Sequence, residues 1–264
     1  MAEITQEYFL TIAKSINTLD YNFQSNYCDD YIFIDNLDYY DHKIKDIVNE
    51  KGYVVIEFLE YSNKIEAYLE NIFGSYMVDK NPNKLNYTKL QYSVGSKYYA
   101  LSSLAQPIHT DEGYTNTYPK YVGLYCQNES IMGGCSIIVK FEPLFKLIKN
   151  YYPLCIDKLF NYNALKVYNA NGCENKPLLF KFNDSTGISY SPVLKKLEGN
   201  KDVLNVFKFI TSYVHDVKNQ IRFKLKKNQL LILDNRKILH GRTSFQNNDT
   251  RILYRYWLNK EVLC

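Results

Sequence analysis

The sequence predicts a mainly β protein with flanking helices, whose core is a double-sheet jelly roll. Short runs rich in β-branched and aromatic residues recur after residue 85, and turn-forming residues separate them. Helical periodicity is confined there to two stretches. So many short strands suit a double-sheet jelly roll. The expected strands are Tyr87 to Tyr92, Tyr121 to Gln127, Ser136 to Lys140, Ala164 to Tyr168, Leu178 to Phe182, Ile221 to Leu225, Gln229 to Leu233 and Arg251 to Leu258.

Two helices are expected to interrupt these strands as insertions that pack on the core. The first covers residues 142–159 and breaks at Pro153, because proline has no amide proton for the preceding turn. The second covers residues 203–218 and carries one apolar stripe, formed by Val206, Phe209, Ile210 and Val214. Turn-forming residues gather at 169–175 and 246–250.

Residues 1–85 mix helix and strand and are expected to pack against the jelly roll. Helical periodicity is present in Glu3 to Ile16 and in Ser62 to Phe73, whereas Tyr31 to Ile34 and Tyr53 to Phe58 resemble strands. No repeat, low-complexity tract or linker divides the sequence. We therefore expect residues 1–264 to form a single domain.

Composition argues against several classes of protein. The 32 basic and 28 acidic side chains leave a net charge of only +4, which is too weak for a nucleic-acid-binding surface. No apolar run reaches the roughly 18 residues that cross a bilayer, so no membrane partner is expected. The six cysteines form no C-x-x-C pair and follow no secretory signal, which favours free thiols. We expect a cytoplasmic protein with a small-molecule substrate, in an oligomeric state that the sequence leaves open.

His109 and Asp111 form the first half of a candidate metal site. Residues two apart on a strand project from the same face, so both side chains can bind one ion. A His-x-Asp pair also arises often by chance, and alone it is weak evidence. The pair therefore needs a third ligand from elsewhere in the chain.

His240 supplies that third ligand. It follows an apolar strand and a polar turn at Asp234, where a returning strand would reach the same pocket. The chain has four histidines, and the other two, His42 and His215, lie beside charged residues and are expected to be solvated. Two imidazoles and one carboxylate leave three positions of an octahedral Fe(II) ion open. A catalytic zinc ion with a bound water is the competing interpretation.

Arg251 and Arg255 favour iron over zinc. Their spacing of four places both on one face of a strand whose other residues are largely apolar, so the strand is expected to be buried. A buried arginine needs an anion, and no run of acidic residues lies nearby in the sequence. Because a guanidinium binds a carboxylate through two parallel hydrogen bonds, we expect a carboxylate ligand here.

In these motifs the chain resembles the Fe(II)/2-oxoglutarate-dependent dioxygenases of the taurine dioxygenase and clavaminate synthase type. The resemblance rests on His109-x-Asp111, on Gly133-Gly134-x-Ser136, on Asn-Arg-x-x-x-His-Gly-Arg around His240, and on Arg251 eleven positions later. It covers about the last 160 residues. The order of the four pieces is specific, although each piece alone is not.

The resemblance implies that the core is a double-stranded β-helix, the cupin-like form of the jelly roll, in which His109, Asp111 and His240 bind Fe(II). It also implies that Arg251 binds the distal carboxylate of the co-substrate 2-oxoglutarate. Ser136 would assist, where the family usually has a threonine. Arg255 matches a second family arginine, which faces either the substrate or 2-oxoglutarate. The implied reaction uses O2, converts 2-oxoglutarate to succinate and CO2, and oxidises an unactivated C–H bond of a small metabolite such as an amino acid, most simply by hydroxylation.

Substrate contacts are expected from loops around the mouth of the barrel, with Ser103, Gln106 and Tyr114 as the nearest candidates. A carrier-tethered or isonitrile-pathway substrate, with desaturation or cyclisation as the outcome, is an alternative for the same chemistry. A zinc-dependent hydrolase and a non-catalytic jelly-roll binding protein are the alternatives from other classes. The sequence does not decide which metabolite is oxidised, or with what stereochemistry.

Overall fold

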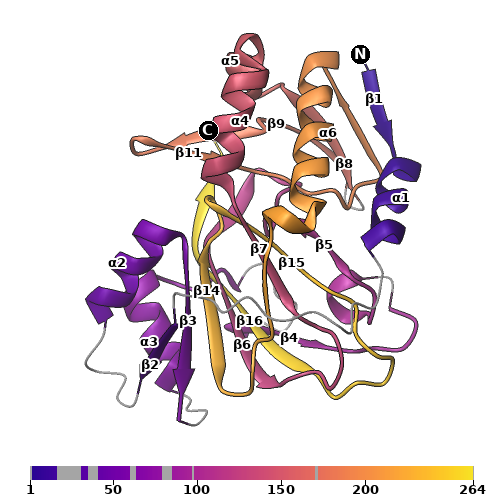
Figure 1. Cartoon of the computed structure of the whole chain (residues 1–264). Helices are drawn as coiled ribbons and strands as arrows, with labels where there is room; N and C mark the ends of the chain where they lie inside the picture. Colours follow the sequence, from indigo (N-terminus) through magenta and orange to yellow (C-terminus); the bar gives the residue numbers. More distant parts are fainter. Residues whose placement is uncertain are drawn as a thin grey trace.

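The computed structural model describes residues 2–16, 31–34, 41–59, 64–78, 85–96, 98–169 and 172–263. Figure 1 shows two stacked parts: a pair of sheets below, flanked by two N-terminal helices, and a layer of helices over smaller sheets above. Nearly all strand pairs are antiparallel. The parallel pair is β2 with β3. The paired sheets form the jelly-roll core that the sequence predicted.

The larger sheet of the core has six strands in the order β2-β3-β14-β6-β16-β4. Its central strand β14 is buried at all six positions, as its unbroken apolar sequence predicts. The strands are β2 (Tyr31–Ile34), β3 (Tyr53–Phe58), β14 (Gln229–Asp234), β6 (Thr117–Asn128), β16 (Ile252–Val262) and β4 (Tyr87–Gln91).

The smaller sheet of the core has four strands in the order β13-β7-β15-β5. They are β13 (Ile221–Phe223), β7 (Ser136–Lys140), β15 (Ile238–Arg242) and β5 (Gln106–His109). Both faces of this sheet are buried, because successive side chains along each strand point to opposite sides. Ile138 and Ile238 pack against the six-stranded sheet. Ile137, Val139 and Leu239 pack on the other side, against the upper helices.

Two N-terminal helices cover the outer face of the six-stranded sheet. These are α2 (Asp41–Lys51) and α3 (Lys64–Phe73), whose apolar residues pack on alternate positions of β3 and β14. Val54, Ile56, Leu230 and Ile232 face these helices, while the intervening residues face the smaller sheet. The period-two alternation thus gives this sheet two buried faces.

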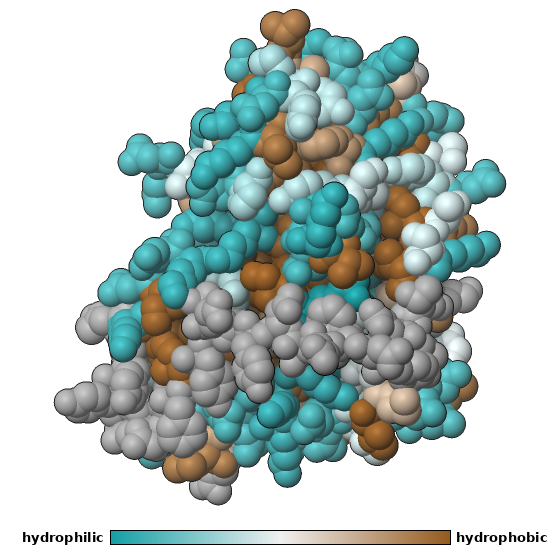
Figure 2. All heavy atoms as spheres, in the orientation of Figure 1, coloured by the Kyte–Doolittle hydropathy of each residue, from teal (hydrophilic) through white to brown (hydrophobic). Residues whose placement is uncertain are grey.

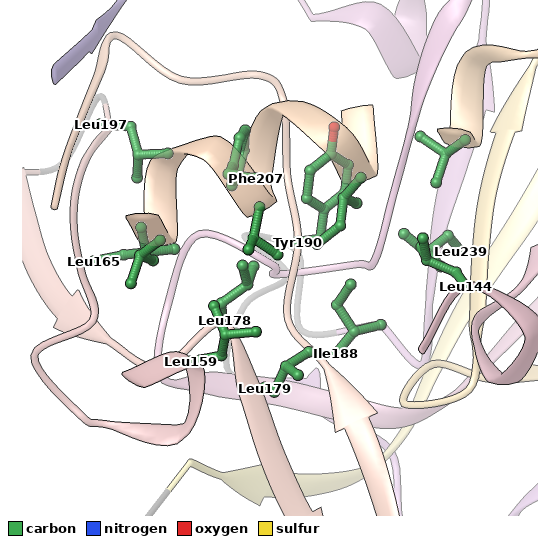
Figure 3. Packing of buried hydrophobic residues seen from close by; sticks show 14 of the residues in the cluster. Leu144, Leu159, Leu165, Leu178, Leu179, Ile188, Tyr190, Leu197, Phe207 and Leu239 are labelled. Carbon is green, nitrogen blue, oxygen red and sulfur yellow. The ribbon is translucent and has the colours of Figure 1, made fainter. Parts of the chain in front are cut away.

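The upper part holds the remaining helices and strands around one apolar cluster. Figure 3 shows Tyr190 beside Phe207 of α6 in this cluster, with ring centroids 4.9 Å apart. On the face drawn in Figure 2, hydrophilic residues cover most of this part. The elements are α1 (Gln6–Ile16), α4 (Phe141–Tyr151), α5 (Ile156–Phe160), α6 (Lys201–His215), the sheet β1 (Ala2–Thr5), β12 (Lys196–Gly199), β8 (Leu165–Asn169) and β9 (Gly172–Lys176), and the hairpin β10 (Leu179–Phe182) and β11 (Ser185–Ile188).

Three details differ from the sequence prediction. Residues 2–5 form a strand and not the start of a helix, because Ile4 pairs with Leu197 of β12. Residues 169–175 were predicted as a turn, but this stretch includes the last residue of β8 and most of β9. The ladder between the two strands continues to the pair Asn169 with Gly172. Helix α2 was not predicted at all.

None of the helices in the described part of the chain is long and apolar enough to span a bilayer.

Candidate metal centre

His109 and His240 form a cross-strand pair in the four-stranded sheet. His109 ends β5, His240 lies in β15, and the two residues are direct partners in the antiparallel ladder. Their ring centroids are 4.6 Å apart. Gly241 allows this close approach, because a Cβ there would lie only 2.8 Å from the Gln106 carbonyl oxygen. Strand register therefore brings the two imidazoles together.

Asp111 completes the cluster from the turn after β5. The sequence argument placed His109 and Asp111 on one face of a common strand, but β5 ends at His109. Asp111 Oδ1 lies 3.2 Å from His109 Nε2 and 3.7 Å from His240 Nε2. One ligand atom from each of the three residues lies within 4.8 Å of the others. The structure thus brings together the three side chains that the sequence selected.

The backbone of Asp111 is fixed by Asn235, which follows β14. The Asp111 amide donates to Asn235 Oδ1 at 2.8 Å. The Asn235 Nδ2 group donates to the carbonyl oxygens of Asp111 and Pro119, each at 3.0 Å. Asn235 is 1% exposed. The side-chain amide of Asn235 thus supplies the backbone hydrogen bonds that Asp111 would have made to a neighbouring strand if β5 were longer. These bonds fix the direction of the Asp111 carboxylate.

The two oxygens of the Asp111 carboxylate have different surroundings. Oδ2 accepts a 2.6 Å hydrogen bond from the Trp257 indole, whereas Oδ1 faces the imidazoles and lies 3.6 Å from an Arg255 nitrogen. Burial alone would raise the pKa of Asp111, but Arg255 and the two histidines outweigh it and hold this pKa well below its usual value. Asp111 is therefore an anion that offers Oδ1 to a cation.

Both imidazoles suit a metal ion, His109 through Nε2 and His240 as a neutral ring. The Nδ1 atom of His109 lies 2.8 Å from the Pro107 carbonyl oxygen, which fixes Nδ1 as the protonated nitrogen and leaves the lone pair on Nε2. Burial, followed by the neighbouring His109, lowers the pKa of His240. A neutral imidazole is the form that binds metal.

Arg251 and Arg255 lie in one pocket with His240. Ser136 and Gln106 also line this pocket. Arg251 is 7% exposed, and its guanidinium makes no hydrogen bond to a described residue. Burial lowers the pKa of Arg251 to about 10, so the group stays charged at neutral pH. A buried cation of this kind needs an anion, and a carboxylate matches its geometry.

Arg255 lies between the metal cluster and the rest of this pocket. Its guanidinium carbon is 4.3 Å from the Trp257 ring centroid, and its Nε atom is buried without a hydrogen-bond partner among the described residues. The donors therefore suit a second carboxylate close to the histidines. Two imidazoles, one carboxylate and the buried guanidinium of Arg251 fit an Fe(II) ion and a dicarboxylate such as 2-oxoglutarate.

A comparison with protein families identifies the chain. The family model described as taurine catabolism dioxygenase TauD, TfdA family, matches residues 34–257. The chain belongs to the TauD/TfdA dioxygenase family. This membership confirms the resemblance found in the sequence. Fe(II), 2-oxoglutarate and O2 are the cofactor and co-substrates of this class of enzyme, and the His-Asp-His cluster suits that iron.

Solved structures share the fold of this TauD-family protein. The non-heme iron oxygenase OrfP, in complex with Fe and alpha-ketoglutaric acid, matches with a TM-score of 0.65 and 13% identity over 83% of this chain and 80% of that one. An asparagine oxygenase in complex with Fe(II), 2S,3S-3-hydroxyasparagine and succinate matches with a TM-score of 0.65 and 13% identity over 96% and 90%. At this identity the likeness shows the jelly-roll fold alone.

The three predicted substrate contacts of this TauD-family protein have different positions. Gln106 lies at the metal cluster, with Nε2 3.3 Å from His109 Nε2. Tyr114 lines a large cavity and donates a 2.8 Å hydrogen bond to Glu112. Ser103 donates to Asn247 and so ties two loops together. A role in substrate binding stays a prediction for all three.

Sequence reasoning missed several residues that support the metal centre. Asn235 was seen only as part of a family motif, and Trp257 only as a sign of burial. Lys176 of β9 is fully buried and donates to the carbonyl of Gly113, in the turn that carries Asp111. No local signal marks Lys176, because its burial depends on strands that are distant in sequence.

His215 corrects a prediction. It was expected to be solvated, but its Nδ1 atom lies 2.8 Å from the Thr211 carbonyl oxygen and its Nε2 atom accepts from the Ile108 amide at 3.3 Å. Burial lowers the pKa of His215, which keeps the ring neutral and able to accept. The packing of α6 against β5 explains both contacts. The side chain of His42 lies outside the described residues.

Proposed function

We propose that this protein hydroxylates an unactivated C–H bond of a free amino acid. The substrate R–H, O2 and 2-oxoglutarate give R–OH, succinate and CO2. The iron and its co-substrate, when bound, supply the oxidation, and the protein positions the C–H bond. The observation that carries the proposal is the presence of two guanidinium groups, buried Arg251 and partly buried Arg255, in the same pocket as His240. Each guanidinium can bind one carboxylate, one from 2-oxoglutarate and one from the amino acid.

Arg251 is assigned to the distal carboxylate of 2-oxoglutarate. Its guanidinium lies in the pocket without an ion pair to a described residue, although Asp249 is near enough to oppose the lowering of its pKa. Ser136 at the start of β7 lines the same pocket and is 4% exposed. A serine hydroxyl and a guanidinium together satisfy both oxygens of a carboxylate. His109, Asp111 and His240 would hold the iron at the other end of the co-substrate.

Arg255 is assigned to the carboxylate of the amino acid. Stacking on Trp257 fixes its plane, and its buried Nε atom has no partner among the described residues. Because Arg255 lies 3.6 Å from Asp111, a substrate bound to it would lie next to the metal cluster. The solved structures of OrfP with (3S)-hydroxy-L-Arg and of asparagine oxygenase with hydroxyasparagine support amino acids as the substrate class.

The first test is an anaerobic optical titration with Fe(II) and 2-oxoglutarate, followed by addition of single amino acids. We expect a visible charge-transfer absorption from the iron-bound 2-oxoglutarate, and a shift of that absorption by the substrate amino acid. Admission of O2 should then yield succinate and a hydroxylated amino acid in equal amounts. No absorption with metal bound would favour the zinc hydrolase or the binding protein. Absorption that no free amino acid shifts would favour a carrier-tethered substrate.

Arg255 variants test its role in the same assay. Arg255→Gln should raise the KM for the amino acid by about tenfold or more, because a charged hydrogen-bond pair is lost. The KM for 2-oxoglutarate should change far less. Arg255→Lys keeps the charge but loses the planar pair of donors, so an intermediate effect is expected. An unchanged KM for the amino acid in Arg255→Gln would contradict the assignment.

A further inference from the structure

A large cavity lies beside the metal centre and has no part in holding the metal. Its volume is about 540 Å³, within the range of pockets that bind organic ligands. One wall is α1, which packs against β5, as Figure 1 shows at the right of the view. The other walls come from residues 98–107, from Tyr114 and from residues 192–195.

Pro107 and Tyr114 connect this cavity to the metal centre. The Pro107 ring lines the cavity, while its carbonyl oxygen contacts His109 Nδ1. Tyr114 also lines the cavity, and it lies in the same turn as Asp111. The turn after β5 therefore joins the metal cluster to the cavity wall, which places the cavity next to a molecule held by Arg255.

The cavity walls are mostly apolar, with Gln6, Ser96, Ser102 and Asn169 as neutral polar residues, and carry almost no charge. Of the described residues that line it, none is Asp or Glu, and Lys195 is the one charged side chain. Four large apolar residues of the wall are 43% to 75% exposed: Leu10, Tyr98, Leu104 and Val193. Apolar side chains that gather in the open around a cavity mark a surface that an apolar ligand covers.

We propose, on the basis of the proposed function, that the amino acid substrate carries a large uncharged side chain, aromatic or branched aliphatic, which binds in this cavity. A guanidinium or ammonium side chain would enter a wall without a carboxylate and would lose its hydration without compensation. A short amide side chain would leave most of the volume unfilled. A large apolar side chain gains from burial against Phe9, Leu194 and the exposed residues of the wall.

The test compares leucine, isoleucine, phenylalanine and tyrosine with asparagine, aspartate and arginine as substrates of the iron-loaded enzyme. We expect the highest kcat/KM with a member of the first group. A higher kcat/KM for a charged or short polar amino acid would overturn the inference and leave the proposed function intact. If no free amino acid is oxidised while 2-oxoglutarate binds, both proposals fail.

Binding is measured separately from turnover by fluorescence. Trp257 is the only tryptophan of the chain, and it contacts both Asp111 and Arg255. Leucine or phenylalanine bound to Arg255 under anaerobic conditions should therefore change its emission, and arginine at equal concentration should not. An equal response to arginine would overturn the inference even if turnover were too slow to measure.

Two variants of α1 locate the side chain of the substrate. Ala13 lines the cavity, and Thr11 on the same helix is exposed and does not. Ala13→Trp should raise the KM for the preferred amino acid about tenfold or more by filling the space, with the KM for 2-oxoglutarate unchanged. Thr11→Trp, the matched control, should leave both values unchanged. Equal KM values in the two variants would show that the cavity is not used.

A carboxylate introduced into the cavity wall tests whether cationic side chains are excluded because the wall has no negative charge. Leu104→Glu should make arginine or lysine bind measurably, because the wall then offers a carboxylate to a cationic side chain. Leu104→Gln has nearly the same size and no charge, so it should not acquire this binding. Leu104 is 46% exposed, which makes both variants compatible with folding. Failure of Leu104→Glu to bind either cation would contradict the assigned position of the side chain.

Discussion

The indole of Trp257 donates a 2.6 Å hydrogen bond to Oδ2 of Asp111 and thereby leaves Oδ1 as the oxygen that faces the two histidines. The two residues are 146 positions apart in sequence. They meet because β16 pairs with β6 along nearly its full length, which carries Trp257 to the turn after β5. The hydrogen bond thus leaves Oδ1 as the carboxylate oxygen available to a metal ion.

Trp257→Phe should weaken metal binding with little effect on folding. Loss of a hydrogen bond to a metal-binding carboxylate typically weakens metal affinity about 10- to 100-fold. Calorimetric titration with Fe(II) or Co(II) under anaerobic conditions measures this change. Tyr118→Phe is the control, because it removes a 2.8 Å hydrogen bond to Glu261 elsewhere between β6 and β16. Equal metal affinities in the two variants would exclude the role given to Trp257.

Asn235→Ala should destabilise both the fold and the metal centre. It would leave the amide and carbonyl of Asp111 and the carbonyl of Pro119 without partners in a buried site. Unpaired buried groups of this kind cost about 1–3 kcal/mol each and are not fully additive, so the free energy of unfolding should fall by about 3 kcal/mol.

Urea denaturation measures that loss, and an exposed asparagine supplies its control. Asn163 accepts a hydrogen bond from Asn175 on the surface, so Asn163→Ala should change the free energy of unfolding by less than about 0.5 kcal/mol. Asn235→Ala should also lower metal affinity, because Asp111 is no longer held. Similar unfolding curves for the two variants would show that Asn235 is not needed to position Asp111.

Arg251→Leu should raise the KM for 2-oxoglutarate at least tenfold without destabilising the protein. The guanidinium is buried and has no hydrogen bond to a described residue, so replacing it by an apolar side chain removes a desolvated charge. Steady-state kinetics at saturating amino acid give the KM, and thermal denaturation of the metal-free protein gives the stability. A normal KM for 2-oxoglutarate would remove Arg251 from its assigned role.

Much of the core could be predicted because its chemistry repeats locally. Short runs of apolar, often β-branched residues indicated β3, β7 and β14, and the break at Pro153 separates α4 from α5 as expected. Predictions failed where structure depends on distant partners. Residues 2–5 are extended because they pair with β12 through backbone hydrogen bonds. The polar segment Gly172–Lys176 is a strand because it pairs in the same way with β8.

The metal cluster could also be predicted, whereas its supporting residues could not. His109, Asp111 and His240 stand out because the His-x-Asp pair, a third histidine and Arg251 occur together in one order, although the pair alone is weak evidence. Asn235 and Trp257 are ordinary buried residues by local pattern, and only the meeting of β14, β16 and the turn after β5 gives them their partners. His215 was wrongly expected in solvent for the same reason.

Lys176 makes the stability of the protein depend on pH. Its ammonium donates to the Gly113 carbonyl and to the hydroxyl of Ser189, and burial lowers the pKa of Lys176 to about 7, although Glu174 and Glu112 oppose the shift. Between pH 7 and the ordinary value of 10.5, the unfolded chain keeps a proton that the folded chain has released. Stability from this residue therefore rises with pH in that window, by up to about 1.4 kcal/mol per pH unit.

Lys176→Met should abolish this dependence. The variant should be less stable than the wild type, since the Gly113 carbonyl loses its donor. The decisive quantity is the slope: from pH 7 to pH 9 the wild type should gain about 2 kcal/mol over the variant in urea denaturation. Lys181→Met, at an exposed position, should follow the wild type. Parallel pH profiles for wild type and Lys176→Met would mean that Lys176 keeps its proton in the folded protein. The turn beside Asp111 would then rest on a buried ammonium ion at every pH tested.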